Sequence, residues 1–133
     1  MLEIKFLDLS KQQKTIEKKL KLNLEKVLSE SKFIMGPEVK ELETSLENYT
    51  TSKYCITCSS GTDALILSLL ALDVGKGDVV FCPSFTFPAT AESILMVGAT
   101  PVFVDVGKNT FNICYKSLLN AIEKCKKKNL RIK

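Results

Sequence analysis

The chain has 133 residues, of which 26% are charged and 45% hydrophobic, and its formal net charge at pH 7 is +4. This length suits one ordinary domain with a core of its own, and the composition excludes a disordered or collagen-like chain. The longest apolar stretch, residues 64–72, is far shorter than the roughly 20 residues that span a bilayer. The first residues lack the continuous apolar block of a secretory signal, so we expect a cytoplasmic protein.

The basic residues gather towards the two ends of the sequence. Nine lysines lie within residues 1–40, and seven basic residues lie from Lys116 onward, including the only arginine, Arg131. Nucleic-acid surfaces usually combine arginines with interleaved aromatic residues, and neither group does so. We interpret both groups as solvated helix faces, and we expect neither nucleic acid nor a membrane as a partner.

The chain has five cysteines and no histidine, which excludes an imidazole base and a histidine-containing zinc site within it. Cys55 and Cys58 form a C-x-x-C pair, but they lie in a run that reads as a buried strand, where positions three apart face opposite sides. No second pair completes a metal site, so we expect no metal. The remaining cysteines are interpreted as small core residues: Cys82, Cys114 and Cys125.

Two amphipathic helices are predicted in the first part of the chain. Apolar residues recur at helical spacing over residues 10–31, with lysines roughly opposite. Gly36 interrupts this pattern, and Pro37 suits the first turn of a second helix that ends near residues 50–52. We therefore expect residues 1–52 to form an N-terminal helical arm.

Strands and helices alternate in the remainder, residues 53–133. Strands are predicted over residues 54–58, 79–82, 101–106 and 130–132, and helices over residues 63–72, 89–97 and 115–127. This alternation is typical of a doubly wound α/β fold with a mostly parallel sheet. The sequence stops just inside the last predicted strand, so we expect an incomplete domain and a fragment of a larger protein.

Two loops follow successive predicted strands, at the sheet edge where open α/β folds bind ligands. Ser60-Gly61-Thr62 precedes a helix, whose unpaired N–H groups attract phosphate, although an ordinary cap on Ser60 or Thr62 is the alternative. This loop lacks the glycine spacing of dinucleotide and nucleoside-triphosphate motifs. In the next loop, Phe85 and Phe87 either cover a planar ligand or fill the core.

Four segments occur here in a recognisable order: Gly36-Pro37-Glu38-Val39, Ser60-Gly61-Thr62-Asp63-Ala64-Leu65, Pro83-Ser84-Phe85-Thr86-Phe87 and Gly98-Ala99-Thr100-Pro101-Val102-Phe103-Val104-Asp105-Val106. Together they resemble the N-terminal third of the DegT/DnrJ/StrS family of sugar aminotransferases, which use pyridoxal 5′-phosphate (PLP). The resemblance implies the first part of the large domain of the aspartate-aminotransferase fold (PLP fold type I). Within the family, the chain looks most similar to enzymes that aminate UDP-2-acetamido-2-deoxy-3-oxo-glucuronate.

The resemblance also implies roles for individual residues. In the family, the Ser-Gly-Thr loop holds the cofactor phosphate and an aromatic residue stacks on the pyridine ring. These roles correspond here to Ser60, Gly61, Thr62 and Phe87. The stretch before Gly36 helps to form the nucleotide-sugar site in the family, and it corresponds here to Ser31, Lys32 and Phe33. For Lys32, an exposed surface lysine is the alternative.

The complete enzyme implied by the resemblance is a homodimer that transfers an amino group, with glutamate as donor, to a nucleotide-linked keto-sugar for surface-polysaccharide or amino-sugar biosynthesis. The family's Schiff-base lysine and the Asp partner of the pyridine nitrogen correspond to positions beyond residue 133, so we expect no catalytic residue within this chain and no activity from it alone. A sugar dehydratase of the same family is one alternative. A non-catalytic α/β module that binds a phosphorylated ligand or a partner protein is another.

Overall fold

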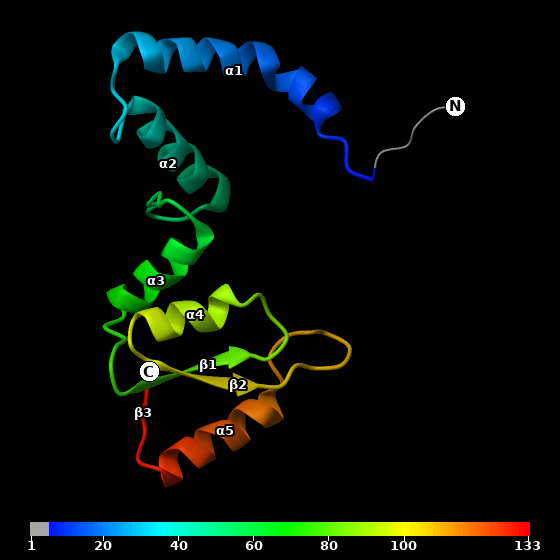
Figure 1. The fold of residues 1–133 in the computed structure, drawn as a ribbon, viewed down its shortest axis with the longest axis vertical. Coiled ribbons are helices and arrows are strands. Elements are labelled where there is room, and N and C mark those ends of the chain that lie inside the picture. Colours follow the sequence, from blue (N-terminus) through cyan, green and yellow to red (C-terminus); the bar gives the residue numbers. More distant parts are fainter. Residues whose placement is uncertain (1–5) are drawn as a thin grey trace. The chain divides into compact units, whose positions relative to one another are not determined.

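The computed structural model describes residues 6–133 (Figure 1). Its elements in chain order are α1 (Ser10–Glu30), α2 (Pro37–Thr50), α3 (Gly61–Ala71), β1 (Asp78–Pro83), α4 (Ala89–Met96), β2 (Thr100–Val104), α5 (Tyr115–Lys127) and β3 (Arg131–Ile132). The chain divides into two compact units, and the boundary along the sequence lies between Thr57 and Cys58. Within residues 6–133, no helix is long and apolar enough to cross a membrane.

The first unit contains α1, α2 and the extended segment that follows α2. The structure confirms both predicted helices, and the break between them depends on Gly36. A Cβ atom at Gly36 would lie 2.5 Å from the carbonyl oxygen of Lys32, so the chain can turn this closely only without a side chain. Pro37 occupies the first turn of α2, where its missing N–H costs no hydrogen bond. Lys26 Nζ lies 3.1 Å from a carboxylate oxygen of Glu38 and links the two helices.

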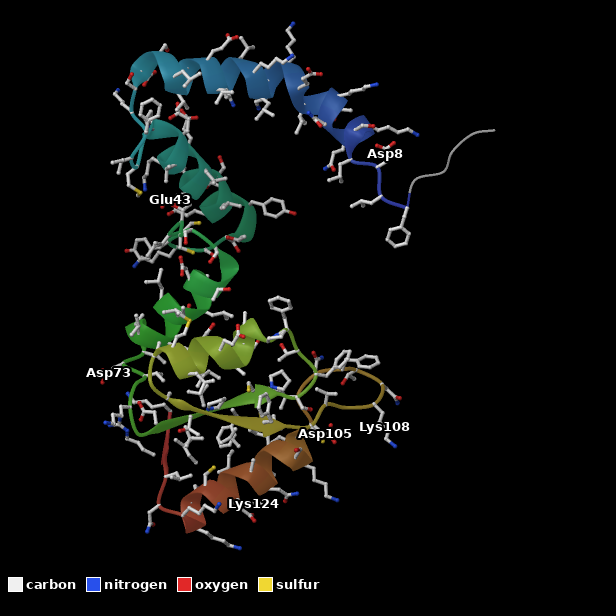
Figure 2. The ribbon with its side chains drawn as sticks, in the orientation of Figure 1. Asp8, Glu43, Asp73, Asp105, Lys108 and Lys124 are labelled. Atoms are coloured by element: carbon white, nitrogen blue, oxygen red, sulfur yellow. The ribbon has the colours of Figure 1, made fainter. Side chains whose placement is uncertain are left out.

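Residues 54–58 are not a strand in this chain, so that prediction is wrong. The backbone N–H groups of Cys55 and Thr57 donate to the carboxylates of Glu47 (3.0 Å) and Glu43 (3.1 Å), which lie one turn apart on α2 (Figure 2 labels Glu43). Alternate N–H groups of a strand normally bond to a neighbouring strand. Here two side chains accept these bonds, so the segment is held without joining a sheet.

The second unit is built on a parallel three-stranded sheet with the order β2-β1-β3. Val79 pairs with Thr100 at one end of the β1–β2 ladder, and Pro83 pairs with Val104 at the other. Figure 1 shows α4 on one face of this sheet and α5 on the opposite face, and α3 packs against α4. The predicted α/β fold with a parallel sheet is thereby confirmed.

The core of this unit lies between the sheet and its helices. It contains small and branched apolar side chains that are at least nine-tenths buried: Val74, Val79, Cys82, Ala89, Ile94, Ala99, Val104 and Cys125. Cys82 and Cys125 are thus core residues, as predicted, whereas Cys114 is only half-buried. Apolar side chains on both faces of the strands explain why the strands read as nearly continuous apolar runs.

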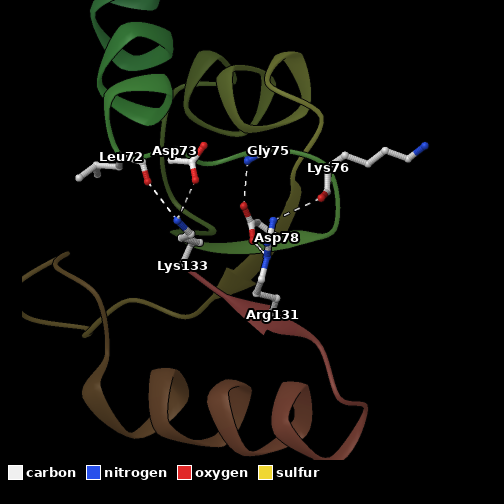
Figure 3. A network of polar contacts seen from close by, with 7 residues as sticks. All are labelled: Leu72, Asp73, Gly75, Lys76, Asp78, Arg131 and Lys133. Carbon is white, nitrogen blue, oxygen red and sulfur yellow. Dashed lines mark hydrogen bonds and ion pairs between the residues drawn. The ribbon is translucent and has the colours of Figure 1, made fainter.

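A buried carboxylate joins β3 to the start of β1 (Figure 3). Asp78 is fully buried, accepts the N–H of Gly75 at 2.8 Å and pairs with the guanidinium of Arg131. Burial alone would raise the pKa of Asp78, but these two hydrogen bonds and the arginine charge outweigh it and hold the pKa below its ordinary value. The ammonium group of Lys133 adds a bond to the carbonyl of Leu72 at 3.3 Å. This network joins β3 to the turn that follows α3.

Candidate functional site

The turn Ser60-Gly61-Thr62 opens α3 and exposes unpaired backbone donors. Ser60 is the N-cap of the helix, and its Oγ accepts the N–H of Asp63 at 3.1 Å. Among the residues that the structure describes, none accepts a hydrogen bond from the N–H of Gly61 or Thr62. A Cβ atom at Gly61 would have no neighbour within 4 Å, so the backbone faces open space. The cap on Ser60 therefore exists, and it still leaves two donors free for an anion.

The chain leading into this turn is braced by short-range contacts. The thiol of Cys58 lies 3.3 Å from the carbonyl oxygen of Ser60, and the hydroxyl of Ser59 donates to the carboxylate of Asp63. A carboxylate in the first turn also interacts favourably with the positive end of the helix dipole. The turn is thus fixed by its own side chains, while the N–H groups of Gly61 and Thr62 have no partner among the described residues.

The loop between β1 and α4 presents two aromatic rings at the surface. The N–H of Ser84 donates to the carbonyl of Val104 at 2.8 Å, and the hydroxyls of Thr86 and Thr90 lie 2.9 Å apart. The side chains of Phe85 and Phe87 are 68% and 76% exposed, so neither fills the core of this chain. The core-filling alternative is therefore wrong here, and Phe87 is accessible to a ligand.

An apolar cavity of about 200 Å³ in the second unit is lined by residues of α3, β1 and α4. Pro83, at the end of β1, and Thr90, in the first turn of α4, line it together with residues of α3 such as Leu65. The elements that carry the two candidate loops thus border the same cavity. Within the described chain, no hydrogen bond or ring contact joins Phe87 directly to the turn at residues 60–62.

The residues predicted to bind the nucleotide sugar lie between α1 and α2 in the first unit. Ser31 ends α1 in a left-handed conformation and donates its N–H to the carbonyl of Val27 at 3.0 Å. Lys32 is exposed, with its Nζ 3.5 Å from a carboxylate oxygen of Glu30, and Phe33 is 67% exposed. The three residues are accessible, and their role in binding the sugar nucleotide stays a prediction.

Glu43 was not among the predicted site residues, although it is one of the few buried charged residues within residues 6–133. Its carboxylate accepts both the N–H and the hydroxyl of Thr57, each at 3.1 Å, and these bonds hold the pKa of Glu43 below its ordinary value. The sequence feature that could have identified Glu43 is its spacing from Glu47: the two carboxylates lie four residues apart, beside the apolar stripe of α2. Within residues 6–133, no three Cys, Asp or Glu side chains come together as a metal site would require.

The sequence profile of the DegT/DnrJ/EryC1/StrS aminotransferase family matches residues 14–130. The chain belongs to this family. Its predicted membership is therefore confirmed, and aminotransferases of the family depend on PLP. The four segments that carried the resemblance include both loops of the candidate site.

Relatives within the DegT/DnrJ/EryC1/StrS family include enzymes whose names specify amino transfer to UDP-linked sugars. The UDP-2-acetamido-2-deoxy-3-oxo-D-glucuronate aminotransferase of Pseudomonas aeruginosa is 46% identical over 110 residues, which are 83% of this chain and 31% of the relative. A UDP-N-acetyl-3-dehydro-α-D-glucosamine 3-aminotransferase of Acidithiobacillus ferrooxidans is 51% identical over 81 residues, 61% of this chain and 22% of that protein.

A solved structure of the family has the same fold. The DegT/DnrJ/EryC1/StrS aminotransferase from Brucella abortus superimposes with a TM-score of 0.92 at 42% identity, covering 98% of this chain and 35% of that one. The fold is accordingly that of the first part of a PLP fold type I enzyme, as predicted. The chain spans between about a fifth and a third of the length of these relatives.

Proposed function

We propose that this chain is the cofactor-phosphate-binding part of a PLP-dependent aminotransferase that acts on a nucleotide-linked keto-sugar. The observation that carries this proposal is the pair of unpartnered N–H groups of Gly61 and Thr62 at the start of α3, in a chain that belongs to an aminotransferase family. The free N–H groups and the helix dipole at such a helix start favour anions, of which a phosphate monoester is one.

The residues present fit PLP. The N–H groups of Gly61 and Thr62 and the Thr62 hydroxyl are donors for a phosphate, and the open space at Gly61 lets the anion approach the backbone. Phe87 offers an exposed aromatic face for a planar ring. When bound, the cofactor supplies the electron sink on which amino transfer depends.

This chain's own part in the reaction is binding and positioning. The turn at residues 60–62 would neutralise the phosphate through backbone donors that need no rearrangement, since Ser60 already fixes the helix start. Phe87 would cover one face of the pyridine ring and exclude water from it. We place no proton-transfer group within this chain.

We further propose a UDP-linked 3-keto sugar as the acceptor and glutamate as the amino donor. The names of the two relatives above support the acceptor, because both denote UDP-linked sugars oxidised at C3. Ser31, Lys32 and Phe33 would contribute to the nucleotide-sugar site, with the Lys32 ammonium facing the diphosphate. We also propose that the complete enzyme is a cytoplasmic homodimer.

The test is a titration of the complete apo-protein with PLP, followed by absorbance and by the induced circular dichroism of the bound cofactor. Thr62→Ala removes a hydroxyl donor to a charged group, which is worth about 1.5–3 kcal/mol, so we expect the Kd to rise about tenfold to a hundredfold. Phe87→Ala should also weaken binding, whereas Thr44→Ala, an exposed threonine on α2, should not.

A parent protein that does not bind PLP, or two site variants that bind it as the parent does, would refute the proposal. Product analysis then distinguishes the two chemistries of the family. Incubation with glutamate and a UDP-linked 3-keto sugar should give an amino-sugar, while loss of a sugar hydroxyl without amine incorporation would identify a dehydratase.

A further inference from the structure

The connection between β2 and α5, residues 105–114, is a closely bonded loop to which the proposed function assigns no role (Figure 2 labels Asp105 within it). Val106 and Ile113 form an antiparallel bridge, and the N–H of Cys114 donates to the carbonyl of Asp105 at 2.8 Å. The two ends of the loop are therefore tied together at the end of β2. Such a loop can carry a side chain in a fixed position.

The loop carries Phe111 just after its turn at residues 108–110, and the backbone of Phe111 has a φ of 56°. This left-handed conformation is uncommon for a bulky residue and persists only where the surroundings enforce it. Two hydrogen bonds do so here: the N–H of Phe111 donates to the carbonyl of Gly107, and the N–H of Gly107 to the carbonyl of Asn112, both at 2.9 Å. The fold thus holds an aromatic residue in a conformation that a glycine would adopt more readily.

The ring of Phe111 packs on Phe85, in the loop that leaves β1. Their centroids are 5.7 Å apart and the ring planes are tilted by 41°, within the range that aromatic pairs favour. Figure 1 shows the two loops side by side beyond the ends of β1 and β2. Phe85 precedes Phe87 by two residues, and the backbone between them is fastened at Thr86 through its hydroxyl contact with Thr90.

We propose that Phe111 is a positioning residue that holds the β1–α4 loop through Phe85, so that Phe87 is fixed where it stacks on the cofactor ring. This inference rests on the proposed function, in which Phe87 is the stacking residue. Phe111 itself does not touch the cofactor in this scheme. Without its ring, Phe85 has no aromatic partner among the described residues, and the loop that carries Phe87 is less restrained.

The left-handed backbone provides a clean test. Phe111→Gly removes the ring while suiting the observed φ, so it perturbs the contact with Phe85 and not the loop conformation. Phe111→Tyr keeps an aromatic ring at a side chain that is 62% exposed and has room for the hydroxyl. Phe103→Leu, at a 57% exposed phenylalanine on β2, controls for the loss of a surface ring. All are made in the complete protein, and PLP is the probe.

We expect Phe111→Gly to raise the Kd for PLP by about three- to tenfold and to reduce the induced circular dichroism of the bound cofactor. Phe111→Tyr should restore both values, Phe103→Leu should leave both unchanged, and the melting temperature of the apo-protein should vary little across the set. A Phe111→Gly protein with parental Kd and dichroism would overturn the inference.

Phe87→Ala separates this inference from the proposed function. If Phe87→Ala weakens binding and Phe111→Gly does not, only the positioning role fails. If the parent protein does not bind PLP, or if Phe87→Ala binds it with parental affinity, the proposed stacking fails and the positioning role fails with it.

Discussion

Replacing Ser60 by Asp separates helix capping from phosphate binding at the same position. Ser60 Oγ accepts the N–H of Asp63 at 3.1 Å, and Asp is as good an N-cap as Ser. The stability of α3 should therefore be retained in Ser60→Asp, whereas Ser60→Ala should lose about 1 kcal/mol. Ser60→Asn provides the matched control, because it caps equally well and adds no charge.

The added carboxylate would lie beside the proposed phosphate. Two like unit charges 4 Å apart repel by about 1 kcal/mol in bulk water and by about 4 kcal/mol at an effective permittivity of 20. The Kd of Ser60→Asp for PLP should therefore rise at least about fivefold, and that of Ser60→Asn should stay close to the parental value. Because the repulsion is electrostatic, 1 M salt should reduce the difference between the two variants.

The assay pairs a PLP titration with thermal melting of the apo-protein, so that binding and stability are measured separately. If Ser60→Asp and Ser60→Asn bind PLP with the same affinity, no phosphate lies at this helix start, and the reasoning from the free N–H groups of Gly61 and Thr62 is wrong. If Ser60→Asp melts well below Ser60→Asn, the capping argument fails instead.

Two further predictions concern stability. The side chain of Ile94, on the buried face of α4, is 3% exposed, so Ile94→Ala should lower the free energy of unfolding, measured by chemical denaturation, by about 2–5 kcal/mol. Leu95, the next residue, is 59% exposed, so Leu95→Ala should lower it less. Equal losses in the two variants would contradict this description of the core. The bonds from Thr57 hold the pKa of Glu43 below its ordinary 4.5, so the carboxylate stabilises the fold above that pH and loses this contribution as pH falls through the lowered pKa. Denaturation of Glu43→Gln and parent at several pH values should accordingly show a stability difference near neutrality that shrinks in acid, and a difference independent of pH would refute this role of Glu43.

Local patterns in the sequence were sufficient for most of the elements and for the turn at the start of α3, residues 60–62. Helical spacing, the Gly36–Pro37 break and the alternation of strands and helices are short-range signals, because periodicity and caps depend on residues within a few positions of each other. The N-cap at Ser60 and the glycine at position 61 belong to the same class. The family was identified differently, from the resemblance of the four segments quoted above.

Contacts between distant residues decided what those patterns left open. The run at residues 54–58 has strand-like composition, yet two of its backbone N–H groups donate to the carboxylates of Glu43 and Glu47 and not to a neighbouring strand. Strand propensity does not indicate which group will accept the hydrogen bonds of a segment. Likewise, nothing local indicates that Phe85 packs on Phe111, 26 positions later, or that Asp78 is buried against Arg131. Short-range signals therefore located most of the elements to within about two residues. Only the tertiary structure determined which side chains meet, because each contact depends on how the whole chain packs.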